Sequence, residues 1–167
     1  MKYVGVEFMK YAVVYSSVTG NTEKLAEVIK NKVGQCYFGK PCDEAIEADV
    51  IFVGFWAIGN SCGADVKNFI EKLSGKKVFI FGTVGYDNTQ EYFDEILSNV
   101  KALVPSSNTI IGTYACQGKV AEAVKNKMKE NKPEKYELVK EKLAESVNHP
   151  NENDIKLLQA ELDKVIL

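Results

Sequence analysis

Short, nearly continuous apolar runs alternate along this sequence with segments of helical periodicity. The runs are rich in β-branched and aromatic residues, and they lie at residues 11–15, 50–55, 78–81 and 109–114, with a weaker run at 35–38. Apolarity without alternation is typical of strands buried on both faces of a parallel sheet. Strands and helices in this order predict an α/β protein, a doubly wound three-layer α/β/α sandwich.

The segments between the runs have the spacing of amphipathic helices that cross from one strand to the next. Apolar residues recur three and four positions apart, so each helix presents one apolar face to a sheet. The faces consist of Leu25, Val28 and Ile29, of Val66, Phe69, Ile70 and Leu73, and of Phe93, Ile96, Leu97 and Val100. In such a fold ligands bind beyond the carboxyl ends of the strands, so functional residues are expected in the loops after the strands.

A single domain is expected for residues 1–167, because this length and 46% of hydrophobic residues suffice for one core. Its core is predicted at about residues 9–128 and a C-terminal helical extension at about 132–165. Pro133 opens the first helix of the extension, and an exposed turn at residues 149–151, in which His149 has no role, leads to the second. Two interpretations stay open: the helices cover their own domain, or they form an arm for a homodimer or a partner. The first eight residues receive no function.

Composition excludes several classes of function. The net charge is −2, so no basic surface is expected for a nucleic-acid backbone. All 21 cationic side chains are lysines, which excludes phosphatases and other phosphate enzymes that need arginine. Four cysteines without a C-x-x-C pair and a lone histidine predict no metal site. Neither a membrane-spanning run nor a leader is recognised, so we expect a cytoplasmic protein with reduced thiols and no membrane partner.

The loop after the first predicted strand is the most informative segment. It consists almost entirely of hydroxyl-bearing and small residues, and a helix begins within it: Ser16, Ser17, Val18, Thr19, Gly20, Asn21 and Thr22. Such a loop presents backbone N–H groups, hydroxyls and the positive end of a helix dipole to a phosphate group. It lacks the patterns of nucleoside-triphosphate and dinucleotide loops. The alternative is a helix start that is simply capped by a serine or threonine.

Residues 17–22 resemble the phosphate loop of the flavodoxin family, [ST]-x-T-G-x-T, with every fixed position filled. The resemblance covers about residues 9–128 and implies a five-stranded sheet in the order 2-1-3-4-5 with FMN at its switch point. The segment 116–119, Cys-Gln-Gly-Lys, resembles a turn in a branch of small flavodoxin-like proteins. That branch also has a tryptophan after strand three and a His-Pro-Asn element near the C-terminus.

Two further loops are predicted to contact the cofactor. The loop after strand three contains Phe55, Trp56, Ala57, Ile58 and Gly59, and the loop after strand four contains Thr83, Val84, Gly85 and Tyr86. Trp56 and Tyr86 are candidates for stacking on a flat ring, although each is also of a type that packs over a sheet end. By resemblance to the family, the peptide at Gly59 flips so that its carbonyl accepts a hydrogen bond from flavin N5 after reduction, and glycine tolerates the positive φ that this requires.

These residues include no nucleophile with an activating base, so the chemistry is expected to belong to the cofactor. The predicted function is an FMN-binding electron-transfer protein that shuttles low-potential electrons between redox partner proteins, a donor reductase and an acceptor enzyme. The acids Asp87, Glu91 and Asp94 are expected to lower the potential, and the acidic segment 43–49 is expected to be solvated surface rather than a docking site. Cys62 and Cys116 are expected to be inert. The alternative is an NAD(P)H-dependent FMN reductase or a reductase accessory subunit.

Overall fold

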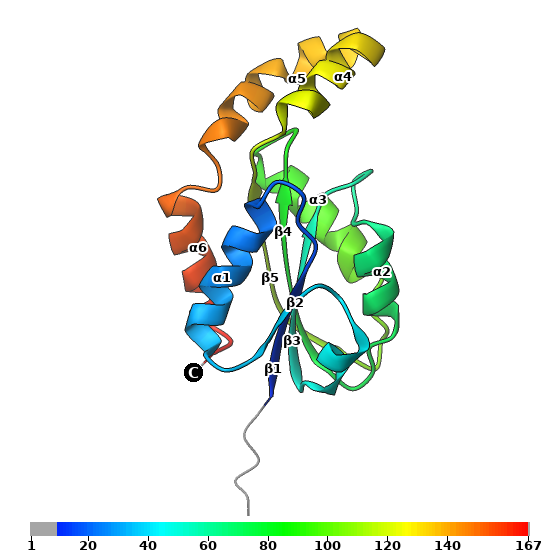
Figure 1. Cartoon of the computed structure of the whole chain (residues 1–167), viewed down its shortest axis with the longest axis vertical. Coiled ribbons are helices and arrows are strands. Elements are labelled where there is room, and N and C mark those ends of the chain that lie inside the picture. The colour runs from blue at the N-terminus through cyan, green and yellow to red at the C-terminus, as the bar shows by residue number, and fades with distance from the viewer. Residues whose placement is uncertain (1–9, 167) are drawn as a thin grey trace, which may run out of the picture.

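The computed structural model describes residues 10–166 and contains one parallel five-stranded sheet (Figure 1). The first eight residues, for which the sequence predicts no function, lie outside the described residues. The strand order is β2-β1-β3-β4-β5, as predicted. The strands are β1 (Tyr11–Tyr15), β2 (Tyr37–Gly39), β3 (Val50–Trp56), β4 (Lys77–Val84) and β5 (Thr109–Gln117).

Helices cover both faces of the sheet, which confirms the three-layer sandwich (Figure 1). One face carries α1 (Asn21–Val33) and α6 (Glu152–Asp163), and their Leu25, Ile29, Leu158 and Leu162 are fully buried beneath them. The other face carries α2 (Ala64–Glu71), α3 (Gln90–Lys101) and the 3₁₀ turn η1 (Asp43–Glu47). Helix α6 belongs to the segment expected as an extension, and it packs against α1 and β5.

Strands β4 and β5 are longer than the sequence predicts. The prediction that residues 82–84 form a loop is wrong, and so is the prediction of a turn at Cys116 and Gln117, because both segments lie within strands. In the sequence Gly82 suggests that the strand ends there. In the structure this glycine instead makes room for an aromatic ring from the neighbouring strand. A Cβ at Gly82 would lie 2.3 Å from the Phe55 ring, and a Cβ at Gly54 would lie 2.4 Å from the Phe81 ring. These glycines therefore continue the sheet, because only a residue without a side chain fits beside the rings.

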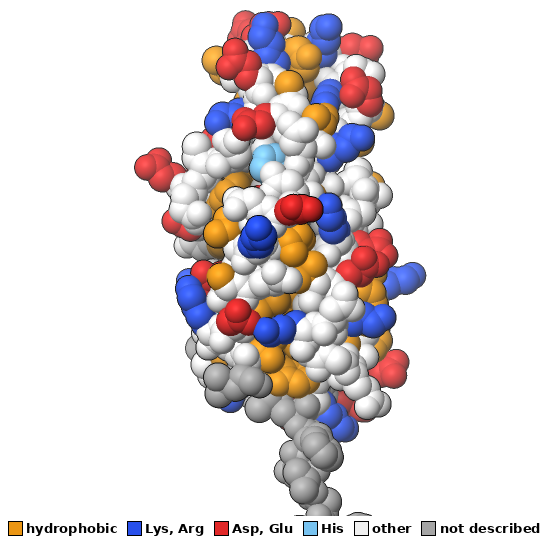
Figure 2. Space-filling model, turned by 90° about the vertical axis from the view of Figure 1, so that its left-hand side faces the viewer, with side chains coloured by type: hydrophobic (Ala, Val, Ile, Leu, Met, Phe, Trp, Pro, Cys, Tyr) orange, Lys and Arg blue, Asp and Glu red, His pale blue; other side chains and the backbone are white. Residues whose placement is uncertain are grey.

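Two helices, α4 (Glu122–Asn131) and α5 (Pro133–Glu145), form an antiparallel pair beyond the carboxyl ends of the strands, and we call them the α4–α5 hairpin (Figure 1). The predicted helix start at Pro133 is confirmed. Positively and negatively charged side chains are mixed over this part of the molecule (Figure 2). The chain leaves for the hairpin and returns from it side by side, where the N–H of Lys119 donates to the carbonyl of His149 over 3.0 Å. Its base is held further by a hydrogen bond from the side-chain amide of Gln117 to the carbonyl of Lys142 at 2.8 Å.

The turn that joins the hairpin to α6 is more ordered than the sequence predicts. His149 was expected to be exposed, but only 18% of its side chain is accessible, and its Nδ1 lies 2.6 Å from a carboxylate oxygen of Asp154. The same carboxylate accepts from the N–H of Asn151, whose side chain in turn caps α6. The expectation was wrong because a capping box holds the turn against the domain. Among the helices that the structure describes, none combines the length and the apolarity that spanning a bilayer requires.

Candidate functional site

A cavity of about 600 Å³ lies at the carboxyl ends of the strands, beneath the α4–α5 hairpin. The loops after β1, β3, β4 and β5 form its floor and walls, and residues of both hairpin helices complete it. This is the position at which doubly wound sheets bind ligands, and the volume is in the usual range for one small-molecule ligand.

The segment 16–22 folds into an open loop at the start of α1. Gly20 is the residue before the helix and has a φ of 86°, a left-handed conformation that glycine adopts without strain. No side chain caps the helix in the usual way, although the Ser17 hydroxyl accepts from the N–H of Gly20 at 3.1 Å and more weakly from that of Glu23 at 3.4 Å. Within the described residues, the backbone N–H groups of Val18, Thr19, Asn21 and Thr22 find no acceptor. The loop therefore offers a cluster of neutral donors.

Two side chains of this loop tie it to the other walls of the cavity. The buried hydroxyl of Thr22 donates to the carbonyl of Phe55 at 3.2 Å and lies 3.0 Å from the hydroxyl of Thr83. The side-chain amide of Asn21 donates to Thr19 Oγ1 at 2.9 Å and to the carbonyl of Lys119 at 2.8 Å. Hydrogen bonds therefore join the segment 16–22, which we call the donor loop, to the ends of the strands and to the base of the hairpin.

The loop after β3 supplies an aromatic wall and a tight turn. Trp56 ends the strand and lines the cavity, and 37% of its surface remains exposed. Gly59 and Asn60 have φ values of 54° and 60°, and the turn is closed by two backbone hydrogen bonds between Ile58 and Ser61. Positive φ at both central residues is typical of a type I′ turn, for which glycine and asparagine are the preferred residues.

The loop after β4 contributes a second aromatic side chain. Tyr86 is half-buried in the cavity wall, and the ammonium group of Lys135 lies 5.1 Å from the centre of its ring. Tyr92, from the first turns of α3, also lines the cavity, and burial raises the pKa of its phenol, which therefore stays neutral at physiological pH. The side chain of Lys135 thus joins the hairpin to an aromatic wall by a cation–π contact.

The structure brings most of the predicted site residues together. Twelve of the sixteen line the cavity: Ser17, Val18, Thr19, Asn21, Thr22, Trp56, Ala57, Gly59, Thr83, Val84, Gly85 and Tyr86. The other four do not line it. Ser16 donates its backbone N–H to Gly54, Gly20 shapes the loop, Phe55 lies in the core, and Ile58 is 42% exposed beside the opening.

Several lining residues are not among the residues predicted to bind the cofactor: Asn60, Asp87, Tyr92, Gly118, Lys119, Val120, Ala121, Val124, Lys132, Lys135 and Val139. Residues 118–121 follow β5, so the rule that placed the other loops at the strand ends would have found them too. The lining residues of the hairpin do not follow a strand, so this rule does not find them.

The charges around the cavity differ from the expectation. Three lysines line it, Lys119, Lys132 and Lys135, against the single carboxylate of Asp87, which lies 3.7 Å from the ammonium group of Lys142. Glu91 and Asp94 are exposed on α3 and do not line the cavity, so of the three acids expected to lower the potential only Asp87 lies in the lining. The apolar face of α3 packs on the sheet, which leaves the charged residues of this helix in solvent.

The two cysteines considered for redox chemistry lie outside the cavity lining. Cys116 is buried in β5, and desolvation raises the pKa of its thiol. Burial also raises the pKa of Cys62, which packs against the core. A raised pKa leaves little reactive thiolate at neutral pH, which supports the expectation that both cysteines are inert.

Comparisons with known proteins agree with this architecture. A family model described as a flavodoxin domain matches residues 12–163. The flavodoxin-like domain-containing protein BilS of Clostridioides difficile is 33% identical over 160 residues, which cover 88% of this chain and 90% of that protein. A flavodoxin of Clostridium beijerinckii is 31% identical over 117 residues, 59% of this chain and 83% of that protein. A crystal structure of a flavoprotein from Lactobacillus acidophilus in complex with FMN has the same fold, with a TM-score of 0.51, 14% identity, and coverage of 65% of this chain and 94% of that one.

Proposed function

Because the chain belongs to the flavodoxin family, we propose that it binds one FMN noncovalently in the cavity and passes electrons between redox partner proteins, a donor reductase and an acceptor enzyme. One observation carries this proposal: the cavity joins a cluster of neutral donors to aromatic walls, and the lining residues that the structure describes include no nucleophile beside a base. The electron chemistry then comes from the isoalloxazine ring of the bound cofactor.

The residues present fit FMN in size and in chemistry. A cavity of about 600 Å³ accepts a single ligand of this class. The free N–H groups of residues 18, 19, 21 and 22 suit a phosphate monoester at the positive end of α1, where no cation is needed to hold it. Trp56 and Tyr86 supply two aromatic walls for a flat ring.

Gly59 is the residue that we propose to respond to the redox state of the ring. It already has a positive φ, and its neighbour Asn60 does too, so the peptide between them sits in a turn that few residue types adopt. Alanine is disfavoured at positive φ, so its replacement of Gly59 changes the energy of this turn conformation relative to a flipped one, and hence of one redox state relative to the other. We expect Gly59→Ala to shift the midpoint potentials and to leave the phosphate contacts intact.

The decisive test is FMN binding followed by reductive titration. Purified apoprotein should quench the fluorescence of one equivalent of FMN, and stepwise addition of dithionite should change the absorbance in two separate one-electron stages. The potentials follow when the titration is repeated with redox-indicator dyes of known potential. The lysines around the cavity oppose the lowering that the sequence predicted from acids. Protein that leaves FMN fluorescent and unbound would refute the proposal.

Direct reduction by a pyridine nucleotide distinguishes a reductase of the same family from an electron carrier. NADPH or NADH added alone should leave the bound flavin oxidised, whereas NADPH with a flavodoxin reductase should reduce it. Rapid bleaching by the nucleotide alone would identify a reductase instead. The reductase-dependent reaction is the positive control, because it shows that the bound flavin accepts electrons.

A further inference from the structure

The loop that follows β4 is held in place mainly by side chains from elsewhere in the chain. It consists of residues 85–88, which we call the β4 loop, and it carries Tyr86 into the cavity wall. Within the part of the chain that the structure describes, these four residues make no hydrogen bond from backbone to backbone. A loop of this kind keeps its shape only while its side-chain partners stay in place.

Three consecutive residues of the β4 loop contact side chains of α5. The contacts are a cation–π contact, an ion pair and two hydrogen bonds: Tyr86 with Lys135 at 5.1 Å, Asp87 with Lys142 at 3.7 Å, and Asn88 with Lys142 and, at 2.9 Å, with Glu145. Each contact is weak on its own, because the side chains are partly exposed. All of them join the same loop to the same helix, so together they fix the two segments relative to each other.

Little apolar packing holds the hairpin itself. It projects beyond the sheet (Figure 1), and of the residues described for α4 and α5 only Met128 and Leu143 are buried. Its position therefore depends largely on the polar contacts at its base and with the β4 loop. Loop and hairpin thus depend on each other, and a change in one is expected to move the other.

Gln117 completes this connection from inside the protein. It ends β5, is 1% exposed, and donates from its side-chain amide to the carbonyl of Gly85 at 3.2 Å and to the carbonyl of Lys142 at 2.8 Å. The amide oxygen is buried and has no hydrogen-bond partner within residues 10–166. Such an acceptor costs about as much free energy as two hydrogen bonds provide. The amide is therefore better explained by the two segments that it joins than by the stability of the fold.

We propose that Gln117 is a positioning residue for the cofactor: it holds the β4 loop and α5 as one unit, so that the hairpin fixes Tyr86 in the cavity wall. The proposal rests on the proposed function, and it adds a role for a helix that lies outside the loops at the strand ends. Because coupling between two sites is reciprocal, FMN that binds against the β4 loop also stabilises the position of α5.

Two variants cut the connection from different sides. Gln117→Leu removes both hydrogen bonds and keeps an apolar side chain of similar size, and Asn88→Ala removes the contacts with Lys142 and Glu145. In each variant FMN affinity, measured by fluorescence quenching, should fall about five-fold to ten-fold. The visible circular dichroism of the bound flavin, which reports the surroundings of its ring, should change as well. Asn88 is only partly buried, so its variant tests the connection even where the substitution of Gln117 prevents folding.

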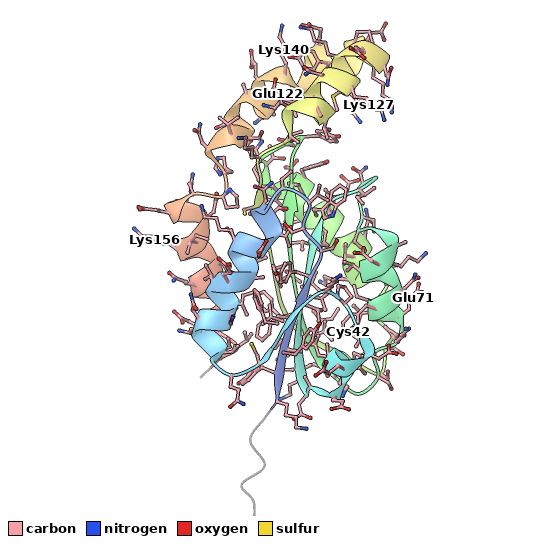
Figure 3. The ribbon with its side chains drawn as sticks, viewed as in Figure 1. Cys42, Glu71, Glu122, Lys127, Lys140 and Lys156 are labelled. Atoms are coloured by element: carbon pink, nitrogen blue, oxygen red, sulfur yellow. The ribbon has the colours of Figure 1, made fainter. Side chains whose placement is uncertain are left out.

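Lys140→Ala is the matched control on the same helix. Lys140 forms its ion pair with Glu137 of α5 itself and lies on the side of the hairpin away from the strands (Figure 3). This variant should retain the FMN affinity and the visible circular dichroism of the parent protein.

A double-mutant cycle separates positioning from stability. If Gln117 acts by placing Tyr86, then Gln117→Leu should weaken FMN binding by less than about two-fold in a Tyr86→Ala background. Hydrogen exchange tests the reciprocal effect: FMN should slow the exchange of α5 amides in the parent and in Lys140→Ala, and should slow it less in Gln117→Leu and Asn88→Ala.

Three results would overturn the positioning role. Unchanged affinity and circular dichroism in both Gln117→Leu and Asn88→Ala show that the β4 loop keeps its shape without α5. Equal effects of Gln117→Leu with and without the Tyr86 ring show that it does not act through that ring. A lower free energy of unfolding with unchanged circular dichroism of the bound flavin shows a structural role alone. Failure of the parent protein to bind FMN would instead refute the proposed function, so the two failures are distinguishable.

Discussion

The cavity has two walls that are built in opposite ways, the donor loop at residues 16–22 and the α4–α5 hairpin. The donor loop is uncharged, offers mainly backbone N–H groups to the cavity, and consists of seven consecutive residues. The hairpin contributes charged and apolar side chains, Val124, Lys132, Lys135 and Val139, from two helices. The difference teaches that a loop of phosphate-binding type can be built from local backbone geometry, whereas the other wall depends on side chains that the tertiary fold brings together.

The largest effect is expected from placing a charge in the neutral wall. Thr19→Asp sets a carboxylate beside the phosphate, and two like charges about 4 Å apart at an effective dielectric constant near 20 repel by about 4 kcal/mol. FMN affinity, measured by fluorescence quenching, should fall by at least about 100-fold. Thr19→Asn is the neutral control and should bind FMN within a few-fold of the parent. Equal affinities of the two variants would show that the phosphate lies elsewhere.

A smaller effect is expected from cutting the connection between the walls. Asn21→Ala removes the hydrogen bonds to Thr19 Oγ1 and to the carbonyl of Lys119. The free energy of unfolding should decrease by about 1 kcal/mol and FMN affinity should fall by about five-fold, as measured by denaturant titration and by fluorescence. Asn153→Ala, on the exposed surface of α6, should change neither quantity. Full FMN affinity in Asn21→Ala would show that the two walls act independently.

The smallest effect on the cavity is expected from alkylation of a cysteine at the opposite end of the sheet. A hydrogen bond with Tyr37 lowers the pKa of the Cys42 thiol, whereas burial raises the pKa of Cys36, Cys62 and Cys116. A lower pKa means more thiolate at a given pH, so iodoacetamide at neutral pH should label Cys42 first, as peptide mass spectrometry would show. FMN affinity should not change on labelling. Labelling of Cys116 before Cys42 would contradict the burial described here.

The donor loop and the sheet were predictable because their determinants are local. Continuous apolar runs specify buried parallel strands, and residues 16–22 place hydroxyls and a glycine where a helix begins. The extent of β4 was not predictable, because Gly82 is read as a break until the ring of Phe55 is known to pack against it. The same holds for the hairpin: the spacing of Tyr136, Val139 and Leu143 predicts a helix, but it does not say that Val139 faces the cavity.

The hydrogen bond between Lys119 and His149 closes a long excursion of the chain beyond the sheet. The base of this excursion is also held by the hydrogen bonds from Gln117 to the carbonyl of Lys142 and from the N–H of Val120 to the Ser146 hydroxyl, so insertions there would disturb β5. Changes in length are therefore expected to be tolerated best at the far turn between the two helices, around residues 131–133.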